Sequence, residues 1–575
     1  MPSPRAGGAG PGGDLPGGAV DGDRVGRALS ARLPDVGDSS RRLAGNSLAV
    51  AGWTSVSRVT GFGRVAVTAA VLGPTYLGNI YQATNVVPNY LYSALTGPLF
   101  ATLLVPPLVR HIDARDRRAE EDLVGAFLGL AVLVFTAVAI LVLAAGPLLL
   151  RLLTLGVEDP AVGAAQRRVG WLLLLMLLPQ VVLYAIAFTA EAVMNAHGRF
   201  ALAAAAPAVE NLGIMATLVA VAVLFGTDTP VQDVSMRQLW LLGLGTTAGV
   251  GLHAVTQCWG ARRVGVRLIP RMGWRNPEVQ AIIRRAVPSL GYSGLNALRG
   301  FGPLVVANRV PGGVVAFDLA RHFALLPVAL GARPIAVALL PRLSRLYHRG
   351  RLRDFRDELV RGVSLMLFVA VPAAVAYVAL ARPLASAISL GEMASGAGVA
   401  LIAAAIGALG PSVVGEGGFF IATHSSYARH DARSPLYAML IRTGVVAVGM
   451  LVASLLTNGI AVLVALGLFT SAADLAAACH LGNRLGRDLP RTGERFAPSL
   501  LRALVASLLM AGPAFLVATH LPGHLDSRWG EQIGLVAAIL TGVVIFVGIQ
   551  WLWRSPELST LLSGFGRLRT EIEPP

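Results

Sequence analysis

Long apolar segments, each near the length of about 20 residues that a helix needs to cross a bilayer, recur along almost the whole chain. Segments of this kind form membrane-spanning helices, because backbone polar groups in lipid must be satisfied internally. Of the 575 residues, 54% are hydrophobic and only 14% are charged, which excludes a soluble globular protein. The sequence therefore predicts an all-α polytopic membrane protein with about fourteen transmembrane helices, at residues 47–73, 80–109, 122–150, 169–194, 201–226, 238–261, 279–308, 314–340, 358–381, 395–422, 435–457, 459–482, 498–519 and 531–553.

The first of these spans carries two arginines, Arg58 and Arg64. An arginine at bilayer depth costs roughly 2.5 kcal/mol or more, so it normally faces a bundle interior or a water-filled cavity. The alternative is a pair of arginines that extend to the membrane surface. Arg58 lies near mid-span, which makes that alternative harder to satisfy. We therefore interpret the first span as part of a polar path for an anion.

The distribution of arginine sets the expected orientation. The basic residues of the chain, all arginine, concentrate in the N-terminal tail, at 110–118, 262–285, 342–361 and 484–495, and after residue 553. The positive-inside rule then places both termini in the cytoplasm. Since the net charge of +16 lies in short loops between spans, it does not indicate nucleic-acid binding. Cys258 and Cys479 fall in apolar spans, so neither a disulfide framework nor a metal site is expected.

An internal repeat relates two parts of the chain. Gly61-Phe62-Gly63 recurs as Gly300-Phe301-Gly302, 239 residues later, and the same offset pairs Gly73 with Gly312 and Pro88 with Pro327. Six spans separate the copies, so the repeat is parallel, with two pseudo-symmetric six-helix lobes followed by two C-terminal helices. The predicted division is a disordered cytoplasmic tail at 1–45, a first lobe at 46–265, a second lobe at 266–485, spans 13 and 14 at 486–555, and a cytoplasmic C-terminal tail at 556–575.

The repeated spans also share their charges, since spans 7 and 8 carry Arg299, Asp318, Arg321, His322 and Arg333. Inside a low-dielectric bundle, these cations favour a phosphate or diphosphate, which arginine binds in a bidentate manner. An ion pair between Asp318 and Arg321 within one helix is an equally good interpretation of those two residues.

Three glutamates, Glu191, Glu210 and Glu416, lie near or inside other spans. Each either binds a coupling cation or, more simply, pairs with a neighbouring arginine. No loop is long enough for a separate soluble domain and no nucleotide motif is present, so neither an ATP-driven pump nor a membrane enzyme is expected. Transport would then depend on the membrane potential or on an ion gradient, with no cofactor and with the driving ion left open.

Four stretches resemble one known family. They are residues 57–73 with their two arginines, Pro88-Asn89 with the later Leu-Val-Pro, the segment from Asn195 to Phe200, and the segment from Tyr427 to Pro435. Together with the fourteen-span plan, they make the chain similar to the MurJ/MviN family of lipid II flippases, within the multidrug/oligosaccharidyl-lipid/polysaccharide exporter superfamily. The last two stretches lie at cytoplasmic turns, where alternating charges can pair across the hairpin and Pro435 suits the first turn of a helix.

The resemblance implies a flippase that translocates a polyprenyl-diphosphate-linked cell-wall precursor, with lipid II as the leading candidate, across a bacterial cytoplasmic membrane for peptidoglycan synthesis. Its expected partners are that lipid-linked glycan and membrane lipids, with the cell-wall synthesis machinery as a further candidate. With the charge pattern, it implies substrate-binding residues Arg58, Arg64, Asn89, Arg299, Arg321 and His322. The expected structural or gating residues are Asn195, Arg199, Tyr427, Arg429, Asp431, Arg433 and Pro435.

The chain also departs from the family pattern. Asn79 replaces a carboxylate, Tyr92 and Ser93 replace an arginine pair, and His322 falls where the family has an arginine. These differences leave a flippase for another lipid-linked glycan as the alternative. A cation-coupled exporter of small molecules fits less well, because it would need an acidic and aromatic site. An intramembrane glycosyltransferase would need catalytic carboxylates beside a large external loop, and none is evident.

Overall fold

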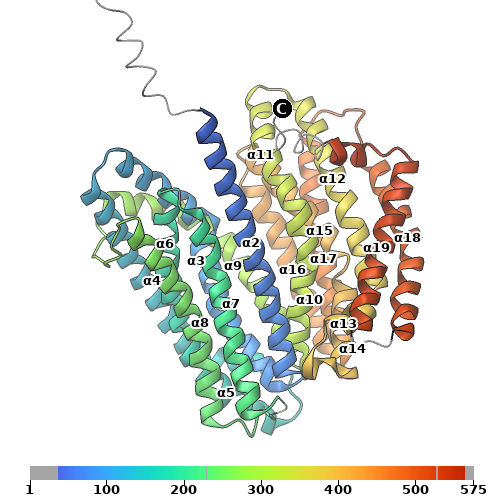
Figure 1. Ribbon diagram of the computed structural model, residues 1–575, viewed down its shortest axis with the longest axis horizontal. Coiled ribbons are helices and arrows are strands. Elements are labelled where there is room, and N and C mark those ends of the chain that lie inside the picture. The colour runs from blue at the N-terminus through green and yellow to red at the C-terminus, as the bar shows by residue number, and fades with distance from the viewer. Residues whose placement is uncertain (1–35, 228, 526–528, 564–575) are drawn as a thin grey trace, which may run out of the picture.

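The computed structural model describes residues 36–227, 229–525 and 529–563, except for the side chains of residues 36–48, 95–103 and 285–289. Two groups of long helices lie side by side, with two further helices packed against the second group (Figure 1). The first group comprises α2 (Val36–Leu72), α3 (Tyr76–Asp113), α4 (Arg117–Leu153), α5 (Pro160–Leu177), α6 (Pro179–Ala196), α7 (Phe200–Phe225) and α8 (Met236–Arg263). The described part of the chain contains no strand, so the predicted all-α fold is confirmed.

The second group contains more interrupted helices. It comprises α9 (Pro277–Ala307), α10 (Gly313–Pro327), the π-helix η1 (Val328–Ala332), α11 (Arg333–His348), α12 (Leu352–Ala379), α13 (Ala381–Ile388), η2 (Gly391–Ala394), α14 (Gly396–Leu409), α15 (Ser412–Ala428), α16 (Arg433–Leu456) and α17 (Ile460–Arg487). The last elements are α18 (Ala497–His520), η3 (Leu521–His524) and α19 (Gly530–Leu552). Contacts of α12 and α13 with α18 and α19 hold the final pair against the second group.

One helix, or up to three helices in succession, lies along each of the fourteen predicted spans. By length and apolarity, ten of the described helical segments could cross a membrane, or eleven when α14 and α15, bent by 43°, count as one span. The three long helices outside this set are α2, α3 and α9. Helices α2 and α9 carry arginines within their apolar stretches, Arg58 and Arg64 in α2 and Arg299 in α9, and α3 contains residues 95–103, whose side chains lie outside the described part.

The repeat predicted from sequence has a structural counterpart. Gly73 and Gly312 both have positive φ, +58° and +72°, and each lies in the turn after the first helix of its lobe. Gly63 and Gly302 each face the sulfur of a methionine on the helix packed alongside, Met215 of α7 and Met450 of α16. The repeated glycines therefore occupy equivalent positions in the helix packing of the two lobes.

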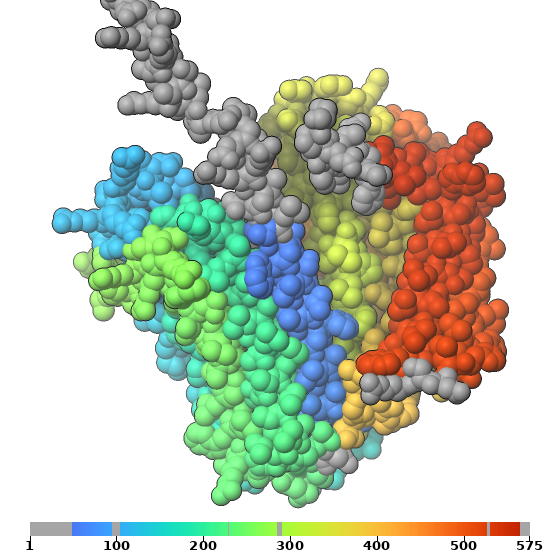
Figure 2. All heavy atoms as spheres, in the orientation of Figure 1, coloured from blue at the N-terminus to red at the C-terminus, as the bar shows by residue number. Residues whose placement is uncertain are grey.

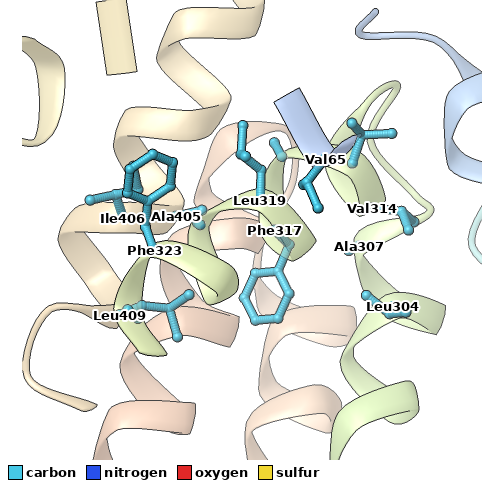
Figure 3. Packing of buried hydrophobic residues seen from close by; sticks show 14 of the residues in the cluster. Val65, Leu304, Ala307, Val314, Phe317, Leu319, Phe323, Ala405, Ile406 and Leu409 are labelled. Atoms are coloured by element: carbon cyan, nitrogen blue, oxygen red, sulfur yellow. The ribbon is translucent and has the colours of Figure 1, made fainter. Parts of the chain in front are cut away.

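The lobes touch through an apolar core and a polar contact at one end. In the core, Val65 of α2 packs with Val314 and Leu319 of α10 (Figure 3). The stretch 49–59 of α2 is far more exposed than the stretch that follows it, and α2 is visible between the lobes (Figure 2). For example, Val59 is 71% exposed whereas Val65 is 5% exposed. Within the described side chains of α2, the close contact with the second lobe therefore lies in the stretch after residue 60.

We call the end where the turn after α2 meets the turn before α10 the gate end. Asn79 is fully buried there, donates to the Val310 carbonyl at 2.7 Å and accepts from the Val314 N–H at 2.9 Å. The Gly312 N–H donates to the Thr75 carbonyl at 3.2 Å. A carboxylate at position 79 could not donate to Val310, so the asparagine that departs from the family pattern fits this closed contact.

We expect Asn79→Leu to open the gate end. The substitution leaves a buried carbonyl and a buried N–H without partners, at a cost of about 1–3 kcal/mol each. A cysteine placed at Val314, in a chain lacking Cys258 and Cys479, should then react about tenfold faster or more with a charged thiol reagent. Asn483→Leu on the exposed face of α17 is the matched control. Equal reaction rates in all three proteins would refute the role of Asn79.

Domain limits differ in part from the predicted ones. Helix α2 begins at Val36, inside the segment 1–45 assigned to a tail, while residues 1–35 lie outside the described residues. Val279 and Ile282 of α9 pack into the first lobe, although the sequence assigns them to the second. The segment 556–575 begins with a helix at 556–563, whose Glu557 pairs with Arg502 of α18 at 3.2 Å. Its remaining residues lie outside the described part.

Candidate functional site

The predicted site residues of α10 lie at the seam between the lobes, which we define as the contact of α2 and α3 with α9 and α10. Asp318 is 1% exposed and accepts from Gln82 Nε2 of α3 at 2.8 Å. Arg321 Nη2 donates to Asp318 at 3.3 Å, which confirms the ion pair within one helix. His322 Nδ1 lies 2.8 Å from the Asp318 carbonyl oxygen and 3.4 Å from its carboxylate. Three groups thus surround one buried carboxylate.

Arg321 also faces the first lobe. Its guanidinium lies 5.8 Å from the centre of the Tyr90 ring of α3, within the range of a cation–π interaction. Tyr90 packs where Gly300 of α9 leaves room, since a Cβ at Gly300 would lie 2.5 Å from the Tyr90 hydroxyl oxygen. The Tyr90 hydroxyl and Arg321 Nε are buried and have no hydrogen-bond partner among the described residues. The Tyr90 hydroxyl and the Arg321 guanidinium also interact electrostatically with each other, so this pair links the two lobes at the seam.

Arg64 of α2 lies close enough to interact electrostatically with Glu210 of α7 and with Asp318. It makes no ion pair with either, and its buried Nε has no hydrogen-bond partner in the described part of the chain. Both carboxylates are already satisfied by other groups. Arg64 therefore keeps a positive charge available to an anion, and the surrounding low dielectric strengthens that attraction.

Glu210 belongs to a buried cluster inside the first lobe. Its Oε2 lies 2.7 Å from His253 Nδ1 of α8, and its Oε1 accepts from the Tyr184 hydroxyl of α6 at 2.9 Å. The neighbouring Asn211 donates to the Ser57 carbonyl of α2 at 3.3 Å. The expectation that Glu210 pairs simply with an arginine is therefore wrong, because a histidine supplies the close partner.

A second buried cluster lies inside the second lobe. Arg442 of α16, which is 1% exposed, forms ion pairs with Glu416 of α15 and with Asp474 of α17, the latter at 2.5 Å. Arg299 of α9 joins it through Asp474 at 3.6 Å. Glu416 therefore pairs with an arginine, as the simpler interpretation predicted. Arg299 is bound into this cluster, so only part of its charge is available to a ligand.

The remaining predicted site residues do not join the group of side chains around Asp318. Arg58 lies in the exposed stretch 49–59 of α2 and makes no hydrogen bond or ion pair with the residues described. Asn89 of α3 donates to the Asn85 carbonyl of its own helix at 3.2 Å. Tyr92, at one of the family's arginine positions, stacks on Tyr184 with ring centres 5.0 Å apart. The seam thus brings together Arg64, Arg321 and His322, but not Arg58.

The two predicted turn motifs are structural in this chain. Asp431 accepts from the N–H groups of Arg433 and Ser434, both at 3.0 Å, and so caps α16. Burial raises the pKa of Asp431, but the hydrogen bonds from the Ser434 side chain and backbone outweigh it and hold the pKa below its ordinary value. Arg429 pairs with Asp488 of α17 at 2.9 Å, so the expected pairing of charges within the hairpin is wrong. Pro435 lies in the first turn of α16, as predicted.

The other turn has the same backbone design. Gly198 and His430 both have positive φ, +69° and +60°, and each ends its helix. Asn195 accepts from the Gly198 N–H through its carbonyl at 3.1 Å, and Arg199 precedes α7. His197 Nε2 lies 2.7 Å from Glu120 of α4, which ties this turn to the neighbouring helix. The glutamate and the arginine of the two buried clusters, Glu210 and Arg442, each follow the positive-φ residue by twelve positions.

Sequence reasoning missed His253, Tyr184, Tyr90, Arg442 and Asp474. Arg442 and Asp474 could have been identified from the sequence, because a lone charge inside an apolar span needs a buried partner. Tyr90 could not have been identified, since its role depends on contact between helices from different lobes. No group of three or more histidine, cysteine or acidic side chains within the described ranges could hold a metal ion.

Comparisons with known proteins agree with this fold. The family model described as "Lipid II flippase MurJ" matches residues 68–525. The "Probable lipid II flippase MurJ" of Vibrio cholerae is 25% identical over 545 residues, covering 89% of this chain and 97% of that protein. That of Rhizobium tropici is 24% identical over 334 residues, and the match spans 57% of this chain and 60% of that relative.

Two solved structures share the architecture. "Lipid II flippase MurJ, inward closed conformation" superposes with a TM-score of 0.70 at 16% identity, covering 88% of this chain and 99% of that one. An inward-facing "multidrug resistance MATE family transporter of the MOP superfamily" gives 0.59 at 13% identity, covering 75% and 95%. At these identities the structures establish the fold alone. The family model, which covers most of the chain, shows that this multi-pass membrane protein belongs to the MurJ family.

Proposed function

We propose that this chain is a flippase that carries lipid II, a polyprenyl-diphosphate-linked precursor, across the bacterial cytoplasmic membrane for peptidoglycan synthesis. The observation that carries the proposal is Arg64, which lies between two carboxylates that other groups already satisfy. An arginine left uncompensated in a low-dielectric seam is suited to a diphosphate, which its guanidinium can bind through two hydrogen bonds. Arg321 of α10 adds a second guanidinium on the opposite side of the seam.

The transport cycle follows from the contact between the lobes. The gate end is closed by Asn79 and its partners, while the stretch 49–59 of α2 is exposed. In alternating access, the gate end would open as the two lobes separate there and approach at the other end. The arginine-rich loops place that other end, with both termini, in the cytoplasm. The diphosphate would enter the seam from the inner leaflet while the polyprenyl tail stays in lipid.

The chain would act as a transporter without catalysis and without a cofactor. Its driving force would be the membrane potential or an ion gradient, since the sequence carries no nucleotide motif. The lipid precursor is the proposed substrate partner, and enzymes that build the cell wall are candidate partners at the membrane.

The runner-up is a flippase for a different lipid-linked glycan. Tyr92 favours it, because this residue stacks on Tyr184 at a position where the family has an arginine. The first-lobe side of the seam is therefore more aromatic and less cationic than the family pattern implies. This more aromatic side of the seam would suit a diphosphate lipid that carries a different sugar.

Complementation tests the proposal. We expect the chain to restore growth when a host bacterium is depleted of its own lipid II flippase, and lipid II to appear on the outer leaflet. Dissipating the membrane potential with ATP still present should stop that appearance. Stable expression without rescue, together with normal peptidoglycan in a deletion strain of the native organism, would support the runner-up instead.

A further inference from the structure

The cluster of Glu210 with His253 is a buried acid–base pair that the transport scheme above does not use. The side chains of Glu210 and His253 are only 10% and 12% exposed, and they meet at 2.7 Å. Tyr184 occupies the other carboxylate oxygen at 2.9 Å. Histidine is the side chain whose charge changes most readily under physiological conditions, so a buried histidine–glutamate pair offers a place where a proton can bind.

The second ring nitrogen of His253 has a partner that suits either protonation state. Gln257, one turn further along α8 and fully buried, places its Nε2 3.3 Å from His253 Nε2. In this arrangement the amide donates and the ring nitrogen accepts, which fits a neutral histidine. The Gln257 Oε1 is buried and has no hydrogen-bond partner among the described residues. A reversed amide would offer this oxygen to a protonated Nε2, in exchange for the 3.3 Å hydrogen bond that Gln257 Nε2 donates to the Ala203 carbonyl.

The pair is surrounded by few other charged groups. Arg64 of α2 interacts electrostatically with Glu210, and Glu191 of α6 with His253. Among the described residues, Tyr184 of α6 and Tyr92 of α3 are further ionisable groups near the pair. Helices α2 and α7 pack closely, and Asn211 fixes their register beside Glu210 through Ser57 and Thr60. A change in the charge of the pair is therefore transmitted to Arg64 without any movement of the helices.

We propose that Glu210 and His253 form a proton-binding site that controls how strongly Arg64 holds an anionic lipid diphosphate; this rests on the function proposed above. With His253 neutral, the Glu210 carboxylate keeps its hydrogen bonds to His253 and Tyr184 but retains a net negative charge, which attracts Arg64 and so competes with the diphosphate. With His253 protonated, the pair is neutral and Arg64 is free to bind the anion. The proton and the diphosphate thus stabilise each other, and linkage requires the effect to be reciprocal.

The test measures binding of undecaprenyl-diphosphoryl-N-acetylglucosamine to the purified full chain between pH 8 and pH 5.5. A diphosphate diester keeps its charge over this range, so any pH dependence comes from the protein. We expect the wild type to bind about fivefold tighter or more at the lower pH. His253→Gln should bind weakly at every pH, because Glu210 stays charged. Glu210→Gln should bind tightly at every pH, because the competitor is gone.

The matched control is His197→Gln, which breaks a histidine–glutamate pair of the same 2.7 Å length at the turn between α6 and α7. It should keep the wild-type pH dependence. A pH dependence that persists in both His253→Gln and Glu210→Gln would overturn the inference and leave the proposed function standing. Absence of binding at every pH in every protein would instead count against the proposed function. His253→Gln and Glu210→Gln are expected to change the affinity in opposite directions. General misfolding would weaken binding in both variants, so it cannot produce this result.

Discussion

Arg64→Ala is expected to abolish transport while the amount of protein in the membrane stays at the wild-type level. The guanidinium makes no ion pair with the described residues, so its removal breaks no structural contact that the structure records. Loss of a charge-assisted hydrogen bond to the substrate costs about 1.5–3 kcal/mol, or roughly tenfold to a hundredfold in affinity. The measurement is the rate at which lipid II reaches the outer leaflet, normalised to the amount of folded protein.

Two further variants make this test specific. Arg64→Lys should restore transport only in part, because an ammonium supplies the charge without the planar, bidentate geometry of arginine. Arg382→Ala removes an exposed arginine of α13 and should leave transport unchanged. Full activity in Arg64→Ala would show that the diphosphate is bound elsewhere, and the seam would then lose its assigned role.

The largest loss of stability is expected from Arg442→Leu. Arg442 is buried between Glu416 and Asp474, so its removal leaves two carboxylates in the second lobe with only Arg299 nearby. Breaking a buried ion pair by removing one partner costs about 3–5 kcal/mol. The free energy of unfolding, measured by denaturant titration in detergent, should fall by about that amount.

The comparison variants separate loss of charge balance from loss of packing. Arg351→Leu breaks an exposed pair with Asp354 and should change the free energy of unfolding by about 1 kcal/mol or less. Combining Arg442→Leu with Glu416→Gln and Asp474→Asn should recover part of the lost stability, because no buried carboxylate is then left unpaired. If the triple variant is less stable than Arg442→Leu, packing and hydrogen bonds dominate the cluster and the electrostatic explanation fails.

The sequence by itself determined the class of fold, because apolar segments of membrane length allow few other structures. It also located the repeat, since Gly73 and Gly312 occupy equivalent turns with positive φ. The ion pair of Asp318 and Arg321 could also be predicted from the sequence, because side chains three residues apart on a helix are neighbours. These features depend on local spacing, which a sequence displays directly.

Only the tertiary structure decided which charges are paired and which are free. Arg64 and Arg442 look alike in sequence, as arginines inside apolar spans, yet one has no ion pair within the described residues and the other is held by two carboxylates. The difference arises from α7, α15 and α17, whose positions around each arginine no spacing rule predicts. Partners from distant helices neutralise a buried charge or leave it available, and in this protein that choice separates a structural arginine from a candidate binding residue.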